Sequence, residues 1–328
     1  MILFNDEKLN FYTKKYKKIF VISDPRITKK CLPKINLEYN YLIKIDEGDK
    51  SKSIKTCAKI WKKLNQYNFD SKCLIVNLGG GSISDLGGFC ASVYKRGIDY
   101  INIPTTLIAQ SDASIGGKNG INFNNIKNNI GTINEPKAVF IIIELLSTLS
   151  KSQKQYGVIE IIKHALIADK KLWDYLIKTK KYNYNFLIKK SLKIKKKFTK
   201  QDLYDQKERQ ALNFGHTIGH AVETYLNIKH EVAISIGIIC ESYISYKKKY
   251  ISKQDLIEIE NFLIKKIKIK KINLKNKKRI LKIMQNDKKN INNKILFSLL
   301  NKIGNYKIKE IVNEKLITES LNYYQKNQ

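Results

Sequence analysis

Cys73-Leu-Ile-Val-Asn-Leu78, followed at once by Gly79-Gly-Gly-Ser-Ile-Ser-Asp85, determines the fold expected for the first half of the chain. Residues 73–78 are apolar and rich in branched side chains, which is typical of a buried parallel strand. The glycines that follow allow backbone N–H groups at a helix N-terminus to approach a pyrophosphate. Because Ser84 replaces the third glycine of the G-x-G-x-x-G pattern, an ordinary tight strand–helix turn stays an equal alternative.

Similar short apolar runs occur on both sides of this stretch, and helix-like stretches at 53–66 and 85–95 lie between them. The alternation predicts an α/β, Rossmann-like domain with a mainly parallel sheet over residues 1–149. Ligands of such sheets bind at the carboxyl ends of the strands, where hydroxyl, carboxylate and cationic side chains gather in this sequence. The additional predicted strands are 18–23, 41–45, 100–103 and 138–143, and the polar groups are Pro104-Thr-Thr106, Asp112, Gly116-Gly-Lys118 and Lys127-Asn128.

The second half of the chain, residues 150–328, has a different texture. Long Ile/Leu patterns with lysine between them and no proline predict an all-α domain. All four histidines lie within 164–230, and His216 and His220 are spaced to share one face of a helix. Two imidazoles and a carboxylate from separate segments are a usual set of catalytic zinc ligands. Ordinary surface or core histidines are the alternative.

Composition narrows the function classes. The chain has 328 residues, 43% hydrophobic residues and a net charge of +33. Its five cysteines form no C-x-x-C pair, and no apolar run approaches the length of a membrane span, so we expect a cytoplasmic protein with no membrane partner. The excess charge is nearly all lysine, spread through a chain equally rich in Ile and Asn. We therefore expect no specific nucleic-acid partner, whereas the same charge favours an anionic phosphorylated substrate.

An ordered series of motifs carries a family resemblance. GGGSISDLGGF, YKRG, IPTTLIAQSDASIGGKNGIN, KNNIG, YGVIEIIKHALIAD and RQALNFGHTIGHAVE are followed by His230. This series, over most of residues 20–290, resembles the 3-dehydroquinate synthases, a family of sugar phosphate cyclases. The resemblance implies NAD⁺ and Zn²⁺ (or Co²⁺) as cofactors, a homodimer, and conversion of 3-deoxy-D-arabino-heptulosonate 7-phosphate to 3-dehydroquinate and phosphate in the shikimate pathway.

The resemblance also implies a role for individual positions. The metal ligands are Glu160, His216 and His230. The catalytic positions are Asp112, Lys163, Lys195, Asn213 and His220. The substrate-binding positions are Arg96 (reaching across a dimer interface), Lys118, Asn128, Arg209, Lys288 and Lys289. The NAD-contacting positions are Asp49, Lys52, Gly81, Ser82, Ile83, Ser84, Asp85, Thr105, Thr106, Lys118, Lys127, Leu145, Leu146, Ser147 and Thr148.

Other interpretations stay open for some of these positions and for the whole chain. Asp85 also suits the first turn of a helix, and Asn213 also suits a helix N-cap. The family's H-G-E-A-V reads His230-Glu-Val-Ala-Ile here. The alternative functions are another cyclase of the inosose or valiolone type, a metal-dependent polyol dehydrogenase, and a basic nucleic-acid-binding protein.

Overall fold

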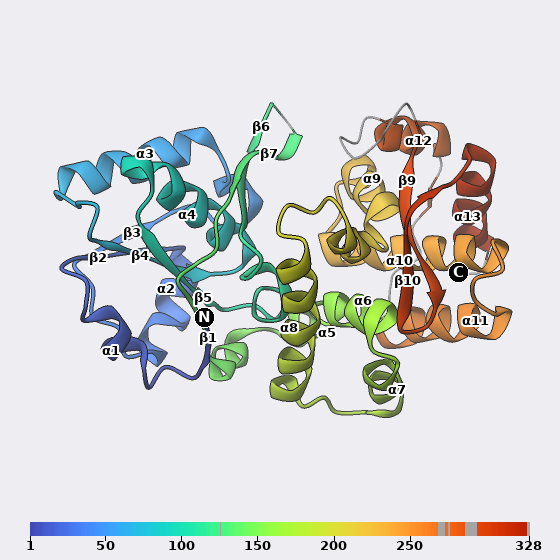
Figure 1. The fold of residues 1–328 in the computed structure, drawn as a ribbon, viewed down its shortest axis with the longest axis horizontal. Coiled ribbons are helices and arrows are strands. Elements are labelled where there is room, and N and C mark those ends of the chain that lie inside the picture. Colours follow the sequence, from blue (N-terminus) through green and yellow to red (C-terminus); the bar gives the residue numbers. More distant parts are fainter. Residues whose placement is uncertain (125, 268–272, 275, 286–293, 327–328) are drawn as a thin grey trace. The chain divides into compact units, whose positions relative to one another are not determined.

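The computed structural model of the protein describes residues 1–124, 126–267, 273–274, 276–285 and 294–326. The chain forms two compact units (Figure 1): unit 1 is Met1–Lys154 with Tyr184–Leu192, and unit 2 is Gln155–Asn183 with Lys193–Gln328. The first part of helix α8 (Tyr184–Gln201) therefore belongs to unit 1 and the rest to unit 2. The predicted division into domains 1–149 and 150–328 stays a prediction.

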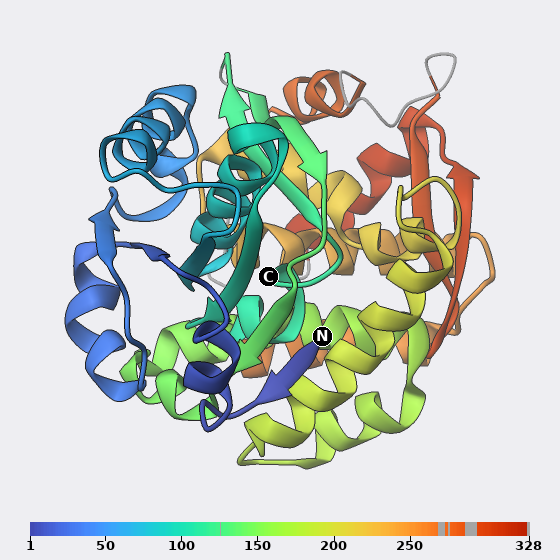
Figure 2. The ribbon, with the colours of Figure 1, turned by 60° about the vertical axis from the view of Figure 1, so that its left-hand side comes forward.

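Unit 1 is built on a parallel sheet with the strand order β1-β8-β5-β4-β2-β3, whose strands lie side by side in Figure 2. Every recorded pairing in this sheet is parallel, so the predicted α/β architecture is confirmed. The strand β1 was not predicted, because three residues are too few to show a pattern. The strands are β1 (Ile2–Phe4), β2 (Ile19–Ser23), β3 (Tyr41–Lys44), β4 (Leu74–Gly79), β5 (Asp99–Pro104) and β8 (Ala138–Ile141).

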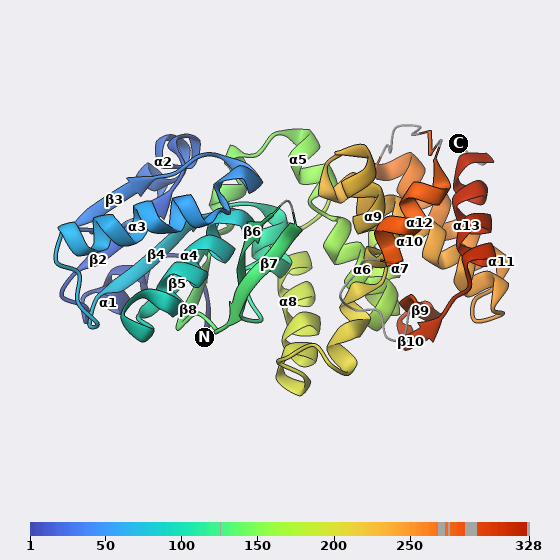
Figure 3. The ribbon, with the colours of Figure 1, turned by 90° about the horizontal axis from the view of Figure 1, so that it is seen from above.

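Helices flank this sheet, and α4 lies along it against β4 and β5 (Figure 3). The predicted helices at 53–66 and 85–95 correspond to α3 and α4. The helices of this part of the chain are α1 (Leu9–Thr13), α2 (Pro25–Lys30), α3 (Ile54–Gln66), α4 (Gly81–Val93) and α5 (Lys151–Tyr156). Shorter helical turns are η1 (Leu32–Lys34), η2 (Gly48–Ser51), η3 (Tyr94–Arg96), the π-helical η4 (Ala109–Ala113) and η5 (Ile143–Thr148).

An antiparallel hairpin, β6 (Lys118–Phe123) and β7 (Ile126–Ile133), packs against α4. Two glycines of α4 make close packing on both sides possible. A Cβ on Gly87 would lie 1.7 Å from Asn77 Oδ1 on β4, and one on Gly88 would lie 2.0 Å from Asn119 Oδ1 on β6. Glycine is therefore concentrated in this segment partly because α4 touches two sheets without room for side chains.

Unit 2 is mainly helical, as predicted. Its helices are α6 (Ile159–Ala168), α7 (Lys170–Lys178), α9 (His216–Leu226), α10 (His230–Lys247), α11 (Lys253–Phe262), α12 (Lys277–Gln285) and α13 (Glu314–Lys326), with the turns η6 (Glu208–Asn213) and η7 (Leu263–Ile267). The helix α10 is buried along most of its length and packs on α6, α9, α11 and α13. In the described ranges no helix is both long and apolar enough to cross a membrane.

One part of unit 2 departs from the all-α prediction. The strands β9 (Leu296–Lys302) and β10 (Asn305–Ile311) form an antiparallel hairpin beside α10. The turn contains Gly304, whose φ of 87° lies in the left-handed region. The prediction treats the whole Ile/Leu-rich pattern of residues 150–328 as helix, although a short apolar run next to a glycine fits a strand equally well.

Candidate metal and nucleotide sites

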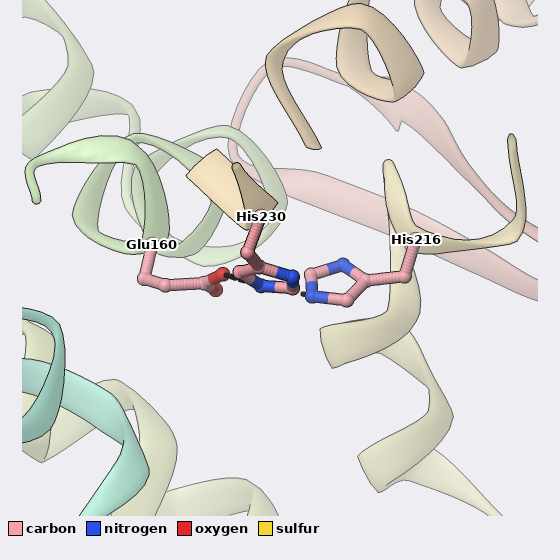
Figure 4. A group of neighbouring side chains, drawn as sticks. All are labelled: Glu160, His216 and His230. Carbon is pink, nitrogen blue, oxygen red and sulfur yellow. Dashed lines mark ion pairs between the residues drawn. The ribbon is translucent and has the colours of Figure 1, made fainter. Parts of the chain in front are cut away.

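Three side chains from three helices of unit 2 converge on one point (Figure 4). Glu160 lies in the first turn of α6, while His216 and His230 are the first residues of α9 and α10. Glu160 Oε1 is 3.6 Å from His216 Nε2 and 3.5 Å from His230 Nε2. Two atoms that both ligate a tetrahedral Zn²⁺ lie roughly 3.3–3.6 Å apart. The group therefore has the atom types and the spacing of a three-ligand metal site.

The close approach of α9 and α10 brings the two histidines together. Gly215 precedes α9 with a φ of 79°, a left-handed conformation that glycine adopts without strain. On the facing helix, a Cβ on Gly237 would lie 1.9 Å from the carbonyl oxygen of Gly215. Glycine at both positions thus lets the start of α9 rest directly on the backbone of α10.

Each histidine has a hydrogen bond that fixes its orientation. His216 Nδ1 lies 3.1 Å from the carbonyl oxygen of Phe214, so Nδ1–H donates and Nε2 is left to face Glu160. His230 Nδ1 lies 3.0 Å from Glu223 Oε2, and its Nε2 likewise faces Glu160. Metal-binding histidines usually donate their second N–H to a carbonyl or carboxylate in this way.

A buried ammonium completes the electrostatics of the group. Lys163 Nζ lies 2.5 Å from Glu160 Oε2, and both side chains are 3% exposed. Burial raises the pKa of Glu160, but the Lys163 ammonium, followed by the two histidines, holds it well below its usual range. Burial and then Lys163 lower the pKa of His216. Burial also lowers the pKa of His230, but hydrogen bonds to Glu160 and Glu223 outweigh it and raise the value to about 10.

A second group of possible ligands overlaps the first. His220, Glu223 and His230 also bring their ligand atoms within 4.8 Å of one another. The two groups share His230, which presents Nε2 to Glu160 and Nδ1 to Glu223. The first group has the better geometry for an ion because its two imidazoles both present Nε2 while their Nδ1 atoms are engaged elsewhere.

The other predicted positions of unit 2 lie on several elements. Lys195 is buried on α8, and His164, the one histidine to which no role was assigned, is fully buried on α6. Arg209 is buried on η6, and its Nη1 donates to the carbonyl oxygen of Leu203 at 2.6 Å. Asn213 ends η6, and the ring of His220 lies 5.1 Å from that of His216. Lys288 and Lys289 lie outside the described residues.

In unit 1, several predicted nucleotide positions meet at the start of α4. Gly80 is the N-cap, and Gly80, Gly81 and Ser82 are only partly buried. The buried Lys52 donates to Asp85 Oδ2 at 2.6 Å and also contacts Asn128 Oδ1. A helix start with a glycine N-cap and a nearby cation suits a phosphate.

Around this helix start, Asp49 connects two further predicted positions. Ser82 Oγ donates to Asp49 Oδ1 at 3.4 Å, and Lys127 Nζ lies 3.6 Å from Asp49 Oδ2. Thr105 and Thr106 follow β5 beside the glycine turn, where Thr105 N–H donates to the carbonyl oxygen of Gly79. The first turns of α4 bury Ile83 and Ser84.

The remaining predicted positions of unit 1 do not form a single group with these. Asp112 lies on η4, and Lys118 is exposed at the start of β6. The segment Leu145–Thr148 lies in η5, where Leu145 and Leu146 are buried and Thr148 Oγ1 is 3.6 Å from Cys31 Sγ. Arg96 is exposed and lines an open cleft of about 450 Å³ together with Asp99 and Lys137.

Two carboxylates of the metal region were missed by the sequence analysis. Glu223 is seven residues after His216 and three after His220, so helical spacing alone places it on their face of α9. Glu241 is the single charged residue in the stretch 232–242, and a buried acid needs partners. Both signals were present in the sequence, but neither named the group that each carboxylate contacts.

A parallel α/β unit with a glycine turn and a helical unit with a carboxylate–imidazole group form a fold that is shared with two solved sugar phosphate cyclases. The solved structure of 2-epi-5-epi-valiolone synthase from Streptomyces hygroscopicus matches with a TM-score of 0.89 and 20% identity, covering 100% of this chain and 97% of that one. A 2-deoxy-scyllo-inosose synthase matches with a TM-score of 0.83 and 22% identity, covering 99% and 96%. These likenesses establish the fold.

The family follows from sequence similarity. The family model for the 3-dehydroquinate synthase N-terminal domain matches residues 42–156, and the model for the C-terminal domain matches residues 157–290. The curated 3-dehydroquinate synthase of Parabacteroides distasonis is 36% identical, with 95% of this chain and 93% of the relative covered. The chain belongs to the 3-dehydroquinate synthase family, which confirms the resemblance drawn from the motifs.

Proposed function

We propose that the protein is a 3-dehydroquinate synthase, a lyase that converts 3-deoxy-D-arabino-heptulosonate 7-phosphate to 3-dehydroquinate and phosphate in the shikimate pathway. The observation that carries this proposal is the convergence of Glu160, His216 and His230 in a member of this family. Curated relatives with this name match almost the whole chain, so the similarity extends over both units.

The three converging residues suit Zn²⁺ or Co²⁺. Glu160 is ionised and His216 is neutral, which are the ligating forms, whereas His230 has to lose a proton when an ion binds. The neighbouring valiolone synthase was solved with NAD⁺ and Zn²⁺, and the inosose synthase with NAD⁺ and Co²⁺. A bound ion of this kind polarises a sugar hydroxyl and lowers its pKa.

The start of α4 suits the diphosphate of NAD⁺, whose role is to accept a hydride from the substrate and return it. Lys52, which is paired with Asp85 and Asn128, supplies the nearby positive charge. No side chain caps this end of the helix, so the first N–H groups of α4 can bond to an anion. Asp49 and Lys127 mark the edge of the same site.

In this proposal, charged side chains of the protein hold charges and protons in fixed positions near the substrate. The Lys163 ammonium keeps Glu160 ionised and stays within proton-transfer distance of it. We assign Lys163 and Asp112 the role of tuning the substrate hydroxyl, and His220 and Lys118 the role of binding the phosphate. Oriented intramolecular steps lower barriers by roughly 7–11 kcal/mol, so a rigid arrangement contributes much of the expected catalysis.

The test is release of inorganic phosphate from the heptulosonate phosphate, with catalytic NAD⁺, before and after treatment with a chelator. We expect phosphate release that stops on chelation and returns with Zn²⁺ or Co²⁺, without accumulation of NADH. Net growth of NADH absorbance would identify a polyol dehydrogenase instead. Absence of phosphate release from the metal-loaded protein would contradict the proposal.

A cyclase with another substrate is the second candidate, because the valiolone and inosose synthases share the fold. The family resemblance places Arg209 at the substrate, and a guanidinium there would bind a planar carboxylate through two parallel hydrogen bonds, which favours a substrate with a carboxylate. Turnover of a carboxylate-free sugar phosphate at a comparable kcat/KM would favour the other cyclases.

We further propose that the protein works as a homodimer in which Arg96 completes the phosphate site of the partner subunit. The exposed position of Arg96 supports this, as does the exposed Ile133, which lines the same cleft. Mixing Arg96→Ala with His216→Ala subunits tests it: each is inactive alone, and hybrids regain one complete site. Activity that stays absent in verified hybrids would contradict the shared site.

The five cysteines, all buried and free of disulfides, support a cytoplasmic location. The positive charge of the many lysines suits an anionic phosphorylated substrate, so no nucleic-acid partner is required to explain it. Binding to arbitrary DNA with a steep salt dependence, and without phosphate release, would contradict that view.

A further inference from the structure

Glu241, on α10, is a completely buried carboxylate that none of the roles above uses. Its Oε2 accepts a hydrogen bond from the backbone N–H of Gly215 at 2.6 Å, and its Oε1 accepts one from the N–H of Ile218 at 3.0 Å. The donors are the N-cap residue and the third residue of α9, on either side of His216. One side chain thus bonds the two backbone groups that bracket a metal-site histidine.

These contacts replace an ordinary helix cap. The N-cap of α9 is Gly215, which has no side chain to accept from the free N–H groups of the first turn. The left-handed φ of 79° favours glycine at this position, and a Cβ added there would lie 2.5 Å from Cγ1 of Ile238 on α10. Because a capping side chain cannot be placed there, the acceptor comes from the facing helix. A carboxylate suits the role, since anions are favoured at helix N-termini and bond N–H groups strongly.

We propose that Glu241 is a positioning residue that fixes the first turn of α9 and thereby the direction of His216 Nε2 toward the metal. This inference rests on the proposed metal site. Glu241 itself touches neither metal nor substrate: it acts through the backbone at Gly215 and Ile218. Partners outside the ligand set commonly change metal affinity by roughly 10–100-fold when they are replaced.

Glu241→Gln is the sharpest variant because it keeps the volume and removes one acceptor. The amide nitrogen then faces a backbone N–H, so one of the two bonds is lost and two donors oppose each other. We expect zinc affinity, measured by chelator competition, to fall roughly 10–100-fold. In the metal-free protein, amide exchange at Gly215 and Ile218 should accelerate at least about tenfold.

Glu260→Gln is the matched control. Glu260 is also a buried carboxylate of unit 2, but it accepts from the Tyr323 hydroxyl and joins α11 to α13. It should leave zinc affinity and exchange at Gly215 and Ile218 unchanged. If Glu241→Gln does not fold, Glu241→Asp keeps the charge with a shorter reach and should show the same two changes.

The outcomes separate this inference from the proposed function. A wild-type protein that binds zinc, together with a folded Glu241→Gln that binds it equally well, would overturn the positioning role alone. A wild-type protein that binds no zinc would overturn the metal site and this inference with it. The absorption bands of bound Co²⁺ add a direct readout, because a displaced His216 changes the ligand field whereas a loss of stability alone does not.

Discussion

The starts of α9 and α10 present the two histidines of the metal group in different surroundings. The His216 side chain is 12% exposed and its pKa is lowered, whereas the His230 side chain is 36% exposed and its pKa is raised to about 10. Besides its ring hydrogen bond to the Phe214 carbonyl, His216 is held by the backbone on either side of it, where the N–H groups of Gly215 and Ile218 donate to Glu241 on α10. His230 is fixed through its ring, which bonds to Glu223 on α9.

Each helix therefore carries the carboxylate that orients the histidine of the other. The two histidines are held in different ways because the two helix starts differ in burial. The backbone N–H groups of a buried helix start need acceptors within the protein, whereas those of an exposed start can bond to water. The His230 ring at the start of α10 is more exposed than that of His216, and a hydrogen bond to the ring itself fixes it. The comparison predicts which substitutions act through structure and which act through the metal.

Removing either histidine should have the largest effect. His216→Ala and His230→Ala each leave two ligands, and we expect loss of stoichiometric zinc after dialysis. Phosphate release should fall at least about a thousandfold, because a Lewis acid supplies several kcal/mol of stabilisation. Metal content and initial rates are the measurements. Full zinc occupancy in either variant would show that the residue is not a ligand.

Gly237→Ala should separate the two helix starts. The added Cβ would lie 1.9 Å from the Gly215 carbonyl, so α9 must shift away from α10. We expect the free energy of unfolding to fall by about 1–3 kcal/mol in thermal or urea denaturation. Zinc affinity should fall in parallel.

Ser235→Ala, on the same helix, is the control for this change. Its hydroxyl bonds only within α10 in the recorded contacts, to the Glu231 carbonyl oxygen, so it should change stability by less than about 1 kcal/mol. Equal stability of Gly237→Ala and the wild type would contradict the close contact between Gly237 and Gly215 that places the start of α9.

Glu223→Gln tests how the His230 ring is held at the start of α10. The His230 ring would lose an anionic acceptor, so zinc affinity should fall roughly 10–100-fold while the fold is kept. Glu231→Gln removes a neighbouring charge that has no recorded bond to the His230 ring, and should have little effect. If the two variants weakened zinc binding equally, general electrostatics rather than ring orientation would explain the loss.

Replacing Asp202 should have the smallest effect on stability, and that effect should depend on pH. Burial raises its pKa, but the backbone N–H groups of Gln206, Lys207 and Arg209 lower it below the usual value. A depressed pKa means that this stabilisation is complete above the unfolded value of about 3.9 and is lost as the pH falls through the folded value. Asp202→Asn should therefore cost about 1 kcal/mol at pH 7 and nothing at strongly acidic pH, as measured by urea denaturation.

The sequence was most informative where chemistry and local spacing coincide. The glycine turn after β4 and the i, i+4 pair His216 and His220 were readable because their patterns lie within one element. The family resemblance then supplied Glu160 and His230, which no local pattern joins to His216. Their roles stay predictions, although the structure brings the three together.

Contacts between residues that are far apart in the sequence could not be predicted from it. Lys52 meets Asp85 across 33 residues and Glu241 meets Gly215 across 26, and nothing in the local pattern of either residue names its partner. The hairpins β6–β7 and β9–β10 were missed for a related reason. Their strands alternate weakly, so their pairing depends on turns and on packing against α4 and α10.

The most direct test of the account is the position of a zinc ion, located by anomalous scattering in crystals of the zinc-loaded protein. The account predicts one ion about 2.0–2.2 Å from Nε2 of His216 and of His230 and from a carboxylate oxygen of Glu160, with Glu223 bonded to the His230 ring. An ion bound instead by His220, Glu223 and Nδ1 of His230 would contradict it, because Glu223 would then be a ligand and His216 would have no metal to face.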